Sequence, residues 1–441
     1  MGSAYSVTCC ESDRRTTLAC CGNPRPPAVA GPRPLCNIRR DGSVNNRFRR
    51  YLAAASAGVA WASASAQSDG GRGLMFDAFQ RFSYESNLYR LPDGARPARG
   101  ARSDLLSLTR LGASYGRPIG LQDVSVAVGL SATRYRESDH LDFDGVDADA
   151  RWKWTVGRAW HGHLLAMQSQ SLSGFDDFSG DERSVNTYRR LEFAGDRAIT
   201  PRWFVGAGAS HTDSEYSDDT RPDADYRARG LSLRGGYRRR DGERIVASIG
   251  RTRGEYPNRS ASRFTDREYR QTDYRVSGSW SPTGITRLSG YLGYVTRRYE
   301  FADNRDFQGA VGRIEMTWQA GGKLSIGAHL RRELGAREDL VDNYVVTEAV
   351  ALRPSWRVSD KLELASEFEY RRRDFGGDPG FLAEAESDRS ENQTRIGLSA
   401  GYRYSRSLGF NASLGWEARN ADSESREFEA TTASVSANLR F

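Results

Sequence analysis

The chain has 441 residues, of which 38% are hydrophobic, with a mean hydropathy of −0.67 and a formal net charge of +7. It is nevertheless rich in Gly (45), Tyr (20), Phe (18) and Trp (9), and because disordered chains are poor in aromatic residues, the composition argues against disorder. A transmembrane β-barrel fits better, since only alternate residues of its strands face lipid and mean hydropathy stays low.

The positive charge is concentrated near the N-terminus. Residues 1–66 contain nine arginines and three acidic residues, a balance of +6, which leaves about +1 for the remainder of the chain. The charge therefore gives no argument for a nucleic-acid partner. All five cysteines also lie in this segment, so the main body uses neither disulfides nor thiolate metal sites.

Residues 47–66 have the pattern of a secretion signal. Three arginines come first, a short apolar run covers 51–61, and an A-x-A cleavage motif ends at Ala66, directly before Gln67. The apolar run is too short to span a bilayer, and the alternative is a buried helix. We expect export through the inner membrane, cleavage between Ala66 and Gln67, and a mature barrel domain over 67–441.

Residues 1–46 do not suit a position ahead of such a signal, because they are rich in Pro, Cys and Arg and show no periodicity. Our hypothesis is that this extension arises from an upstream start codon. Translation would then begin near Val44, which a GTG codon can encode.

The main body shows strand periodicity and contains no apolar stretch long enough for a helical span. Apolar and polar residues alternate clearly over 143–156, 361–371 and 395–404. The polar faces carry full charges, which would be very costly against a dry core. We therefore expect the polar faces to meet water and the apolar faces to meet lipid or a second layer.

Turn signals recur about every 40 residues, which suits one membrane hairpin per repeat. A β-propeller is the alternative, but its blades have four strands where this spacing allows two. Eight short turns alternate with nine longer polar loops, so the sequence predicts an all-β, transmembrane, antiparallel up-and-down outer-membrane β-barrel of about 18 strands. Both chain ends lie on the short-turn, periplasmic side. The short turns are expected at 116–120, 157–158, 200–201, 241–242, 281–284, 320–322, 358–360 and 405–407.

Aromatic residues cluster near the short turns. In a soluble repeat protein they would belong to a core, whereas in a barrel they form an interfacial girdle. We favour the girdle, which would comprise Tyr115, Trp154, Trp160, Trp203, Tyr237, Trp280, Trp318, Trp356, Tyr404 and Trp416.

The last fourteen residues, Phe428 to Phe441, alternate strictly between apolar and polar side chains. Phe441, Leu439 and Val435 lie on the apolar face. This ending resembles the closing strand of bacterial outer-membrane barrels, which the barrel assembly machinery reads. We expect it to pair with a strand that starts near Phe76, with Phe441 at the periplasmic edge.

Several short motifs, taken in order, resemble the EpsL-type outer-membrane proteins of exopolysaccharide biosynthesis operons, within the group called putative β-barrel porin 2. The motifs lie at 84–94, 254–259, 305–313, 322–325, 344–347, 352–356 and 371–375. The resemblance covers about 73–441 and implies an outer-membrane barrel encoded with a polysaccharide assembly system. It supplies no catalytic or ligand residues, and 1–46 have no counterpart in it.

Arginines cluster at the outer ends of the predicted strands. Because neighbours on a strand point to opposite faces, about half of each cluster can line the pore and bind acidic sugars bidentately. Alternatively, they bridge lipopolysaccharide phosphates at the rim or pair with acidic residues on neighbouring strands. The candidates are Arg297, Arg298, Arg331, Arg371 and Arg373.

Other candidate sites are weaker. Residues 142–149 resemble a fragment of a calcium loop, but they lack the bidentate acid and continue into a strand. His161 and His163 share one strand face and fit an interfacial position better than a metal site. Tyr299 and Phe301 could stack on sugars or belong to an outer girdle. We expect no metal, no cofactor and no catalytic residues.

The leading functional hypothesis is a non-enzymatic, porin-like barrel of the Gram-negative outer membrane that serves exopolysaccharide export or assembly. The alternatives are a general diffusion porin and an outer-membrane enzyme acting on lipid or polysaccharide. The expected partners are polysaccharide, outer-membrane lipid and lipopolysaccharide, the barrel assembly machinery, and polysaccharide synthesis and export proteins. The loops near 88–103 and 374–389 are the best candidates to fold inward.

Overall fold

The computed structural model describes residues 73–175, 181–217, 222–239, 242–259, 266–300, 305–336, 344–376 and 389–441. The predicted extension 1–46, the signal 47–66 and its cleavage point between Ala66 and Gln67 lie outside these residues and stay predictions.

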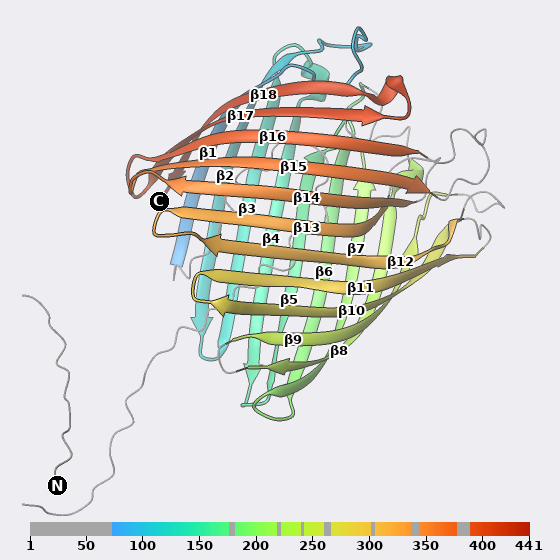
Figure 1. Ribbon diagram of the computed structural model, residues 1–441, viewed down its shortest axis with the longest axis vertical. Helices are drawn as coiled ribbons and strands as arrows, with labels where there is room; N and C mark the ends of the chain where they lie inside the picture. Colours follow the sequence, from blue (N-terminus) through green and yellow to red (C-terminus); the bar gives the residue numbers. More distant parts are fainter. Residues whose placement is uncertain are drawn as a thin grey trace, which may run out of the picture. The chain divides into compact units, whose positions relative to one another are not determined.

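The described chain folds into one closed sheet of 18 antiparallel strands (Figure 1). Each strand pairs with its neighbours in sequence, and β1 pairs with β18 as well as β2, so the sheet has no free edge. The predicted up-and-down barrel and its strand number are confirmed. The strands are β1 (Gly73–Glu85), β2 (Asp104–Ile119), β3 (Gln122–Tyr135), β4 (Phe143–Val156), β5 (Trp160–Leu172), β6 (Val185–Ala198), β7 (Trp203–Tyr216), β8 (Tyr226–Arg238), β9 (Arg244–Glu255), β10 (Glu268–Thr283), β11 (Thr286–Tyr299), β12 (Phe307–Gln319), β13 (Leu324–Ala336), β14 (Tyr344–Arg357), β15 (Leu362–Gly376), β16 (Ser390–Arg403), β17 (Leu408–Ala421) and β18 (Phe428–Arg440).

Three short 3₁₀ turns, η2 (Asp139–Leu141), η3 (Pro222–Ala224) and η5 (Glu424–Arg426), are the helical elements among the described residues. No helix in the described ranges is long and apolar enough to cross a membrane.

The two ends of the barrel differ in the length of their connections. At one end the connections run from two residues (120–121) to five (239–243), and at the other from six (422–427) to eighteen (86–103). Short periplasmic turns and longer outer loops are typical of outer-membrane barrels, so the longer connections mark the outer end. The predicted turns are correct to within a few residues.

Two predicted turns begin too early because proline was taken as a turn signal. Strand β2 continues through Pro118, which faces Asp123 in the register, and the turn follows at 120–121. Strand β10 continues through Pro282, where the register with β11 shifts. Proline has no backbone N–H to donate to a neighbouring strand. It is therefore tolerated near the end of a strand or at an irregularity in the register.

Side chains alternate between the two faces of the wall along each strand. In β15, Glu369, Arg371 and Arg373 are buried, whereas Phe368 and Tyr370 are exposed. Large apolar side chains are exposed all around the outer face, from Leu74 on β1 to Leu439 on β18. An apolar outer face and a charged inner face are what a barrel in lipid requires.

Most of the aromatic residues expected in the periplasmic girdle face outward near the short turns. The exposed ones are Tyr115, Trp160, Trp203, Trp280, Trp318, Trp356 and Tyr404. Tyr237 packs edge-on against Trp203, with ring centroids 5.1 Å apart. Trp154 stacks on Phe193 instead, and Trp416 lies nearer the outer end, where it donates to Glu429. The expected place of Trp416 in the periplasmic girdle is wrong, because Trp416 lies past the middle of β17 as counted from the short turn.

Candidate functional site on the inner wall

The structure places the predicted arginines on both faces of the wall. Arg297, Arg331, Arg371 and Arg373 point inward, and each is buried or half-buried. Arg298 points outward and donates to Asp306 at 2.6 Å. The alternation of a strand explains this division, because Arg297 and Arg298 are neighbours.

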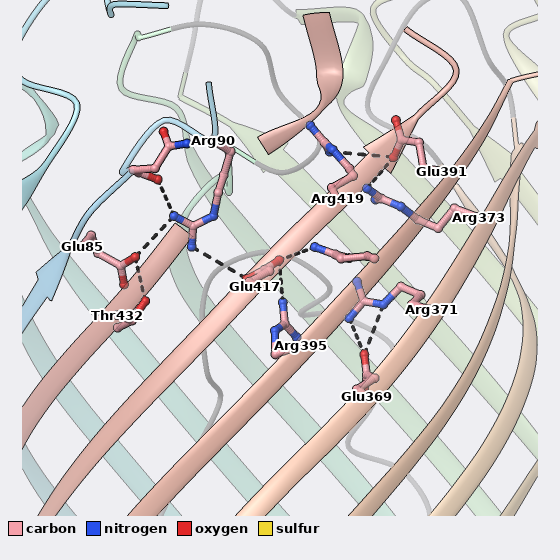
Figure 2. Close-up of polar contacts among 12 residues, drawn as sticks. Glu85, Arg90, Glu369, Arg371, Arg373, Glu391, Arg395, Glu417, Arg419 and Thr432 are labelled. Atoms are coloured by element: carbon pink, nitrogen blue, oxygen red, sulfur yellow. Dashed lines mark hydrogen bonds and ion pairs between the residues drawn. The ribbon is translucent and has the colours of Figure 1, made fainter. Parts of the chain in front are cut away.

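A buried carboxylate on β15, Glu369, is shared by several inward cations, of which Figure 2 shows Arg371. Glu369 accepts from Arg371 at 2.7 Å and lies 3.5 Å from the Arg331 guanidinium. The imidazole of His329, on β13, is 3.6 Å from the same carboxylate. Strands β13, β14 and β15 are adjacent in the sheet, so their inward side chains meet although they are distant in sequence.

A second carboxylate lies nearer the outer mouth. Glu391, only 2% exposed, is 2.7 Å from Arg373, 3.1 Å from Arg426 and 3.7 Å from Arg419. Figure 2 shows Arg373 on β15 and Arg419 on β17 converging on Glu391, which belongs to the strand between them, β16. The site therefore joins three strands and the η5 loop at the rim.

The first long loop also reaches this wall. Arg90 contacts Glu85 at 3.3 Å and Glu417 at 3.9 Å, and its guanidinium lies over the Phe428 ring at 5.7 Å. Its φ of 55° lies in the left-handed region that side chains disfavour, which marks a backbone held by its surroundings. The predicted inward turn of this loop is thus observed at Arg90, whereas 377–388 of the other candidate loop lie outside the described residues.

Together these residues form a continuous patch that we call the Arg–Glu network. Among the described residues, each of its carboxylates meets at least one guanidinium, and its eight arginines outnumber its five glutamates. Removing a shared carboxylate would leave buried cations without a counter-ion, which makes such a network sensitive to single changes. Its members are Arg90, Arg331, Arg353, Arg371, Arg373, Arg395, Arg419 and Arg426 with Glu85, Glu367, Glu369, Glu391 and Glu417.

Elsewhere on the wall, a tyrosine cluster surrounds Arg297. Tyr226 and Tyr269 share a hydroxyl hydrogen bond of 2.7 Å, and the Arg297 guanidinium lies 4.4 Å from the centre of the Tyr269 ring. Tyr256 and Tyr299 complete the buried cluster. Tyr299 is therefore packed against protein and does not present a free ring for a sugar, while Phe301 lies outside the described residues.

The two histidines near the inner end also face inward, contrary to the interfacial position expected from the sequence. His163 bonds Glu192 at 3.0 Å, and His161 lies 3.1 Å from Arg238 and 3.8 Å from Asp196. Successive residues of a strand face opposite sides of the wall. Because Trp160 faces outward, His161 and His163 face inward. In the ranges that the structure describes, no group of acidic, His or Cys residues is arranged to hold a metal ion.

The sequence reasoning found arginines that stand in pairs and missed those that stand alone. Arg395 and Arg419 belong to the network, and each lies two residues from an acidic or amide residue that shares its face. The spacing of Glu369 and Arg371, or of Glu417 and Arg419, was the available signal, because residues two apart share a strand face. Arg90 gave no such signal, since a loop has no fixed periodicity.

The C-terminal part of the chain matches a known family. Residues 255–441, which contain β10–β18, match the family model described as Putative beta-barrel porin 2. The protein is an 18-stranded β-barrel of the Gram-negative outer membrane. Its closed wall and apolar outer face agree with the similarity of its C-terminal part to this barrel family, and the Arg–Glu network lies on the inner face of the wall.

Solved structures of similar architecture include outer-membrane proteins of Pseudomonas aeruginosa and Acinetobacter baumannii. The outer-membrane protein OpdK of Pseudomonas aeruginosa is 13% identical, with a TM-score of 0.46 over 83% of this chain and 99% of that chain. OccAB3 of Acinetobacter baumannii is 12% identical, with a TM-score of 0.47 over 83% and 99%. OccK2 (OpdF) of Pseudomonas aeruginosa, solved in complex with glucuronate, is 14% identical, with a TM-score of 0.48 over 84% and 98%. These values are too low to bear on substrate, and no curated protein matches the chain.

Proposed function

We propose that this porin-like barrel is an anion-preferring channel that serves exopolysaccharide export or assembly. The observation that carries the proposal is the concentration of inward guanidiniums in the Arg–Glu network, as the described residues place them on the inner wall. Fixed positive charge along a pore lowers the barrier for anions, and guanidinium forks suit the carboxylates of acidic sugars. The order of short motifs that resembles the EpsL-type proteins supports the polysaccharide role.

The geometry of the inner wall suits the passive passage of solutes better than the catalysis of a reaction. A barrel of 18 strands is wide enough for an aqueous channel, and passive transport needs only pore width and lumen charge. Arg331 is suited to act on a passing anion because the carboxylate that it contacts, Glu369, is also held by Arg371. Arg353 lies near the same carboxylate and pairs with Glu367. A fully ion-paired wall would offer less attraction.

The test is ion selectivity in planar bilayers. With a KCl gradient across the membrane, the wild-type channel should pass chloride in preference to potassium, and Arg331→Gln combined with Arg353→Gln should move the permeability ratio toward one. Arg332→Gln is the matched control, because Arg332 is on the neighbouring position, faces outward and pairs with Glu348. A sealed barrel, or a cation-selective one, contradicts the proposal.

The polysaccharide role is tested separately in cells. A deletion strain should lose surface polysaccharide, and the gene should restore it, whereas the Arg331→Gln and Arg353→Gln variant should restore it incompletely. Unchanged polysaccharide in the deletion strain removes this role even if the channel is anion-selective.

A general diffusion porin is the second candidate. It is favoured by the extensive pairing of inward charges, for example Arg313 with Glu333 at 2.8 Å and Arg234 with Asp196 at 2.6 Å. Such a porin predicts permeability that depends on solute size, with neutral and acidic sugars of equal size entering proteoliposomes at similar rates. The proposed channel predicts faster entry of the acidic sugar.

A further inference from the structure

A row of basic side chains crosses the outer face of the wall at the level of the outer strand ends. In the strand register, His211 on β7 faces Arg229 on β8, Arg229 faces Arg253 on β9, and Arg253 faces Arg270 on β10. Arg251 lies two residues farther from the outer end on β9 and on the same face. The four arginines are exposed, and we call them the arginine row.

Three members of the arginine row have no carboxylate partner among the described residues. Arg253 is held by Glu268 at 2.6 Å, but Arg229, Arg251 and Arg270 make no ion pair or side-chain hydrogen bond in that part of the chain. Other outward arginines near the outer end do have partners: Arg134 meets Asp144, Arg189 meets Glu215, Arg298 meets Asp306, Arg332 meets Glu348, and Arg372 meets Asp374. Among these outward strand arginines of the described ranges, the unpaired charges therefore lie on β8–β10.

This arrangement is unfavourable without an added anion. Neighbouring strands lie about 4.8 Å apart, and like charges directly opposite each other destabilise a sheet. Arg229 and Arg270 both face Arg253 in the register, and only Arg253 has a counter-ion among the described residues, Glu268, so three guanidiniums crowd around one carboxylate. An anion held between the guanidiniums would turn this repulsion into bidentate hydrogen bonding.

An apolar groove adjoins the arginine row. Its volume is about 800 Å³, and Leu164, Leu191, Phe193 and Leu231 line it beside Arg229, Arg251, Arg253 and Arg270. Phe193 and Leu231 are strongly exposed on the outer face, at 49% and 70%. The groove lies on the lipid-facing side of the wall, where hydrocarbon chains rather than water cover it.

We propose that the arginine row and this groove bind a phosphorylated, acylated lipid of the outer leaflet. Its phosphate groups would lie between Arg229, Arg251 and Arg270, and one or more acyl chains would follow the groove past Phe193 and Leu231. The two halves of the site match the two halves of such a lipid in charge and in polarity. A soluble phosphate would satisfy the arginines alone and gain nothing from the groove.

The first experiment uses the unaltered protein. The folded barrel in detergent is mixed with diphosphoryl lipid A or with the same lipid after enzymatic dephosphorylation, and bound lipid is counted by native mass spectrometry. We expect at least about tenfold weaker retention of the dephosphorylated lipid, since guanidinium–phosphate hydrogen bonds carry the recognition. Equal retention of both lipids overturns the proposal, whatever any variant does.

The second experiment compares two triple variants. Arg229→Gln/Arg251→Gln/Arg270→Gln should lose the preference for the phosphorylated lipid, and without lipid it should melt no lower than wild type because repulsion is removed. Arg298→Gln/Arg332→Gln/Arg372→Gln removes the same charge from the same face and should keep the preference. Equal loss in both triple variants would mean that the binding is nonspecific attraction to the cationic rim, and an unchanged first variant would also refute the site.

The third experiment is a competition between the lipid and an excess of inorganic pyrophosphate. It should compete only weakly with the lipid, because it does not occupy the groove. Full displacement at a concentration similar to that of the lipid would show a soluble-phosphate site instead.

Discussion

Phe76 and Phe441 close the barrel. The Phe76 amide donates to the Phe441 carbonyl at 2.7 Å, the Phe441 amide donates back at 3.0 Å, and the two rings stack with centroids 6.0 Å apart. These contacts join the first strand to the last at the periplasmic end. They confirm the expected pairing of the terminal strand near Phe76.

Deletion of Phe441 should impair assembly strongly. It removes two backbone hydrogen bonds of about 1 kcal/mol each and an aromatic pair of about 1 kcal/mol at the seam of the sheet. We expect the variant to reach the outer membrane at markedly reduced level, measured as the heat-modifiable band in membrane fractions. Phe410→Leu, at an outward aromatic of the neighbouring strand, is the control, and normal levels of the deletion variant contradict this role.

Glu391→Gln should destabilise the outer half of the barrel. The change removes the carboxylate that Arg373, Arg419 and Arg426 share, and breaking a buried ion network costs about 3 kcal/mol or more. The denaturant midpoint of the folded barrel in detergent measures the loss. Glu268→Gln breaks an exposed outward pair and should cost about 1 kcal/mol or less. Similar losses in both would mean that the network contributes no more than a surface pair.

Gly254→Ala should disturb the tyrosine cluster. A Cβ at this position would lie 2.3 Å from the Tyr269 ring, so the ring or the strand must shift, at a cost of about 1–3 kcal/mol. Thermal unfolding with tyrosine fluorescence should show the loss. Gly401→Ala meets no atom closer than 3.8 Å and should be neutral. An unchanged melting temperature for Gly254→Ala would contradict the prediction, because the Tyr269 ring would then make room for the Cβ without a loss of stability.

Leu292→Arg tests which face of the wall meets lipid. Leu292 is 65% exposed at the middle of β11, and an arginine facing the bilayer centre costs about 2–4 kcal/mol. Unfolding from lipid vesicles gives the free energy. Ser289→Arg, on the opposite face and beside Glu315 in the register, should be tolerated. If Ser289→Arg lowered the free energy of unfolding more than Leu292→Arg did, the lipid-facing and lumen-facing sides would be assigned the wrong way round.

The sequence by itself determined the architecture. Strict alternation and regular turn signals are local properties, so they predicted the strand number and the longer loops at one end. They also implied that neighbours such as Arg297 and Arg298 face opposite sides, without deciding which of the two faces inward. The interfacial position expected for His161 and His163 is wrong for the same reason, because the sequence did not settle which parity faces outward.

Only the tertiary structure decided which residues meet. Glu369 lies close to Arg331 and Arg353 because β13, β14 and β15 pair in one register, and a shift by one residue would turn every one of these side chains to the other face. The row of Arg229, Arg253 and Arg270 likewise exists only across three paired strands. Closure at Phe76 and Phe441 joins residues more than three hundred positions apart, and that contact depends on all the strands between them.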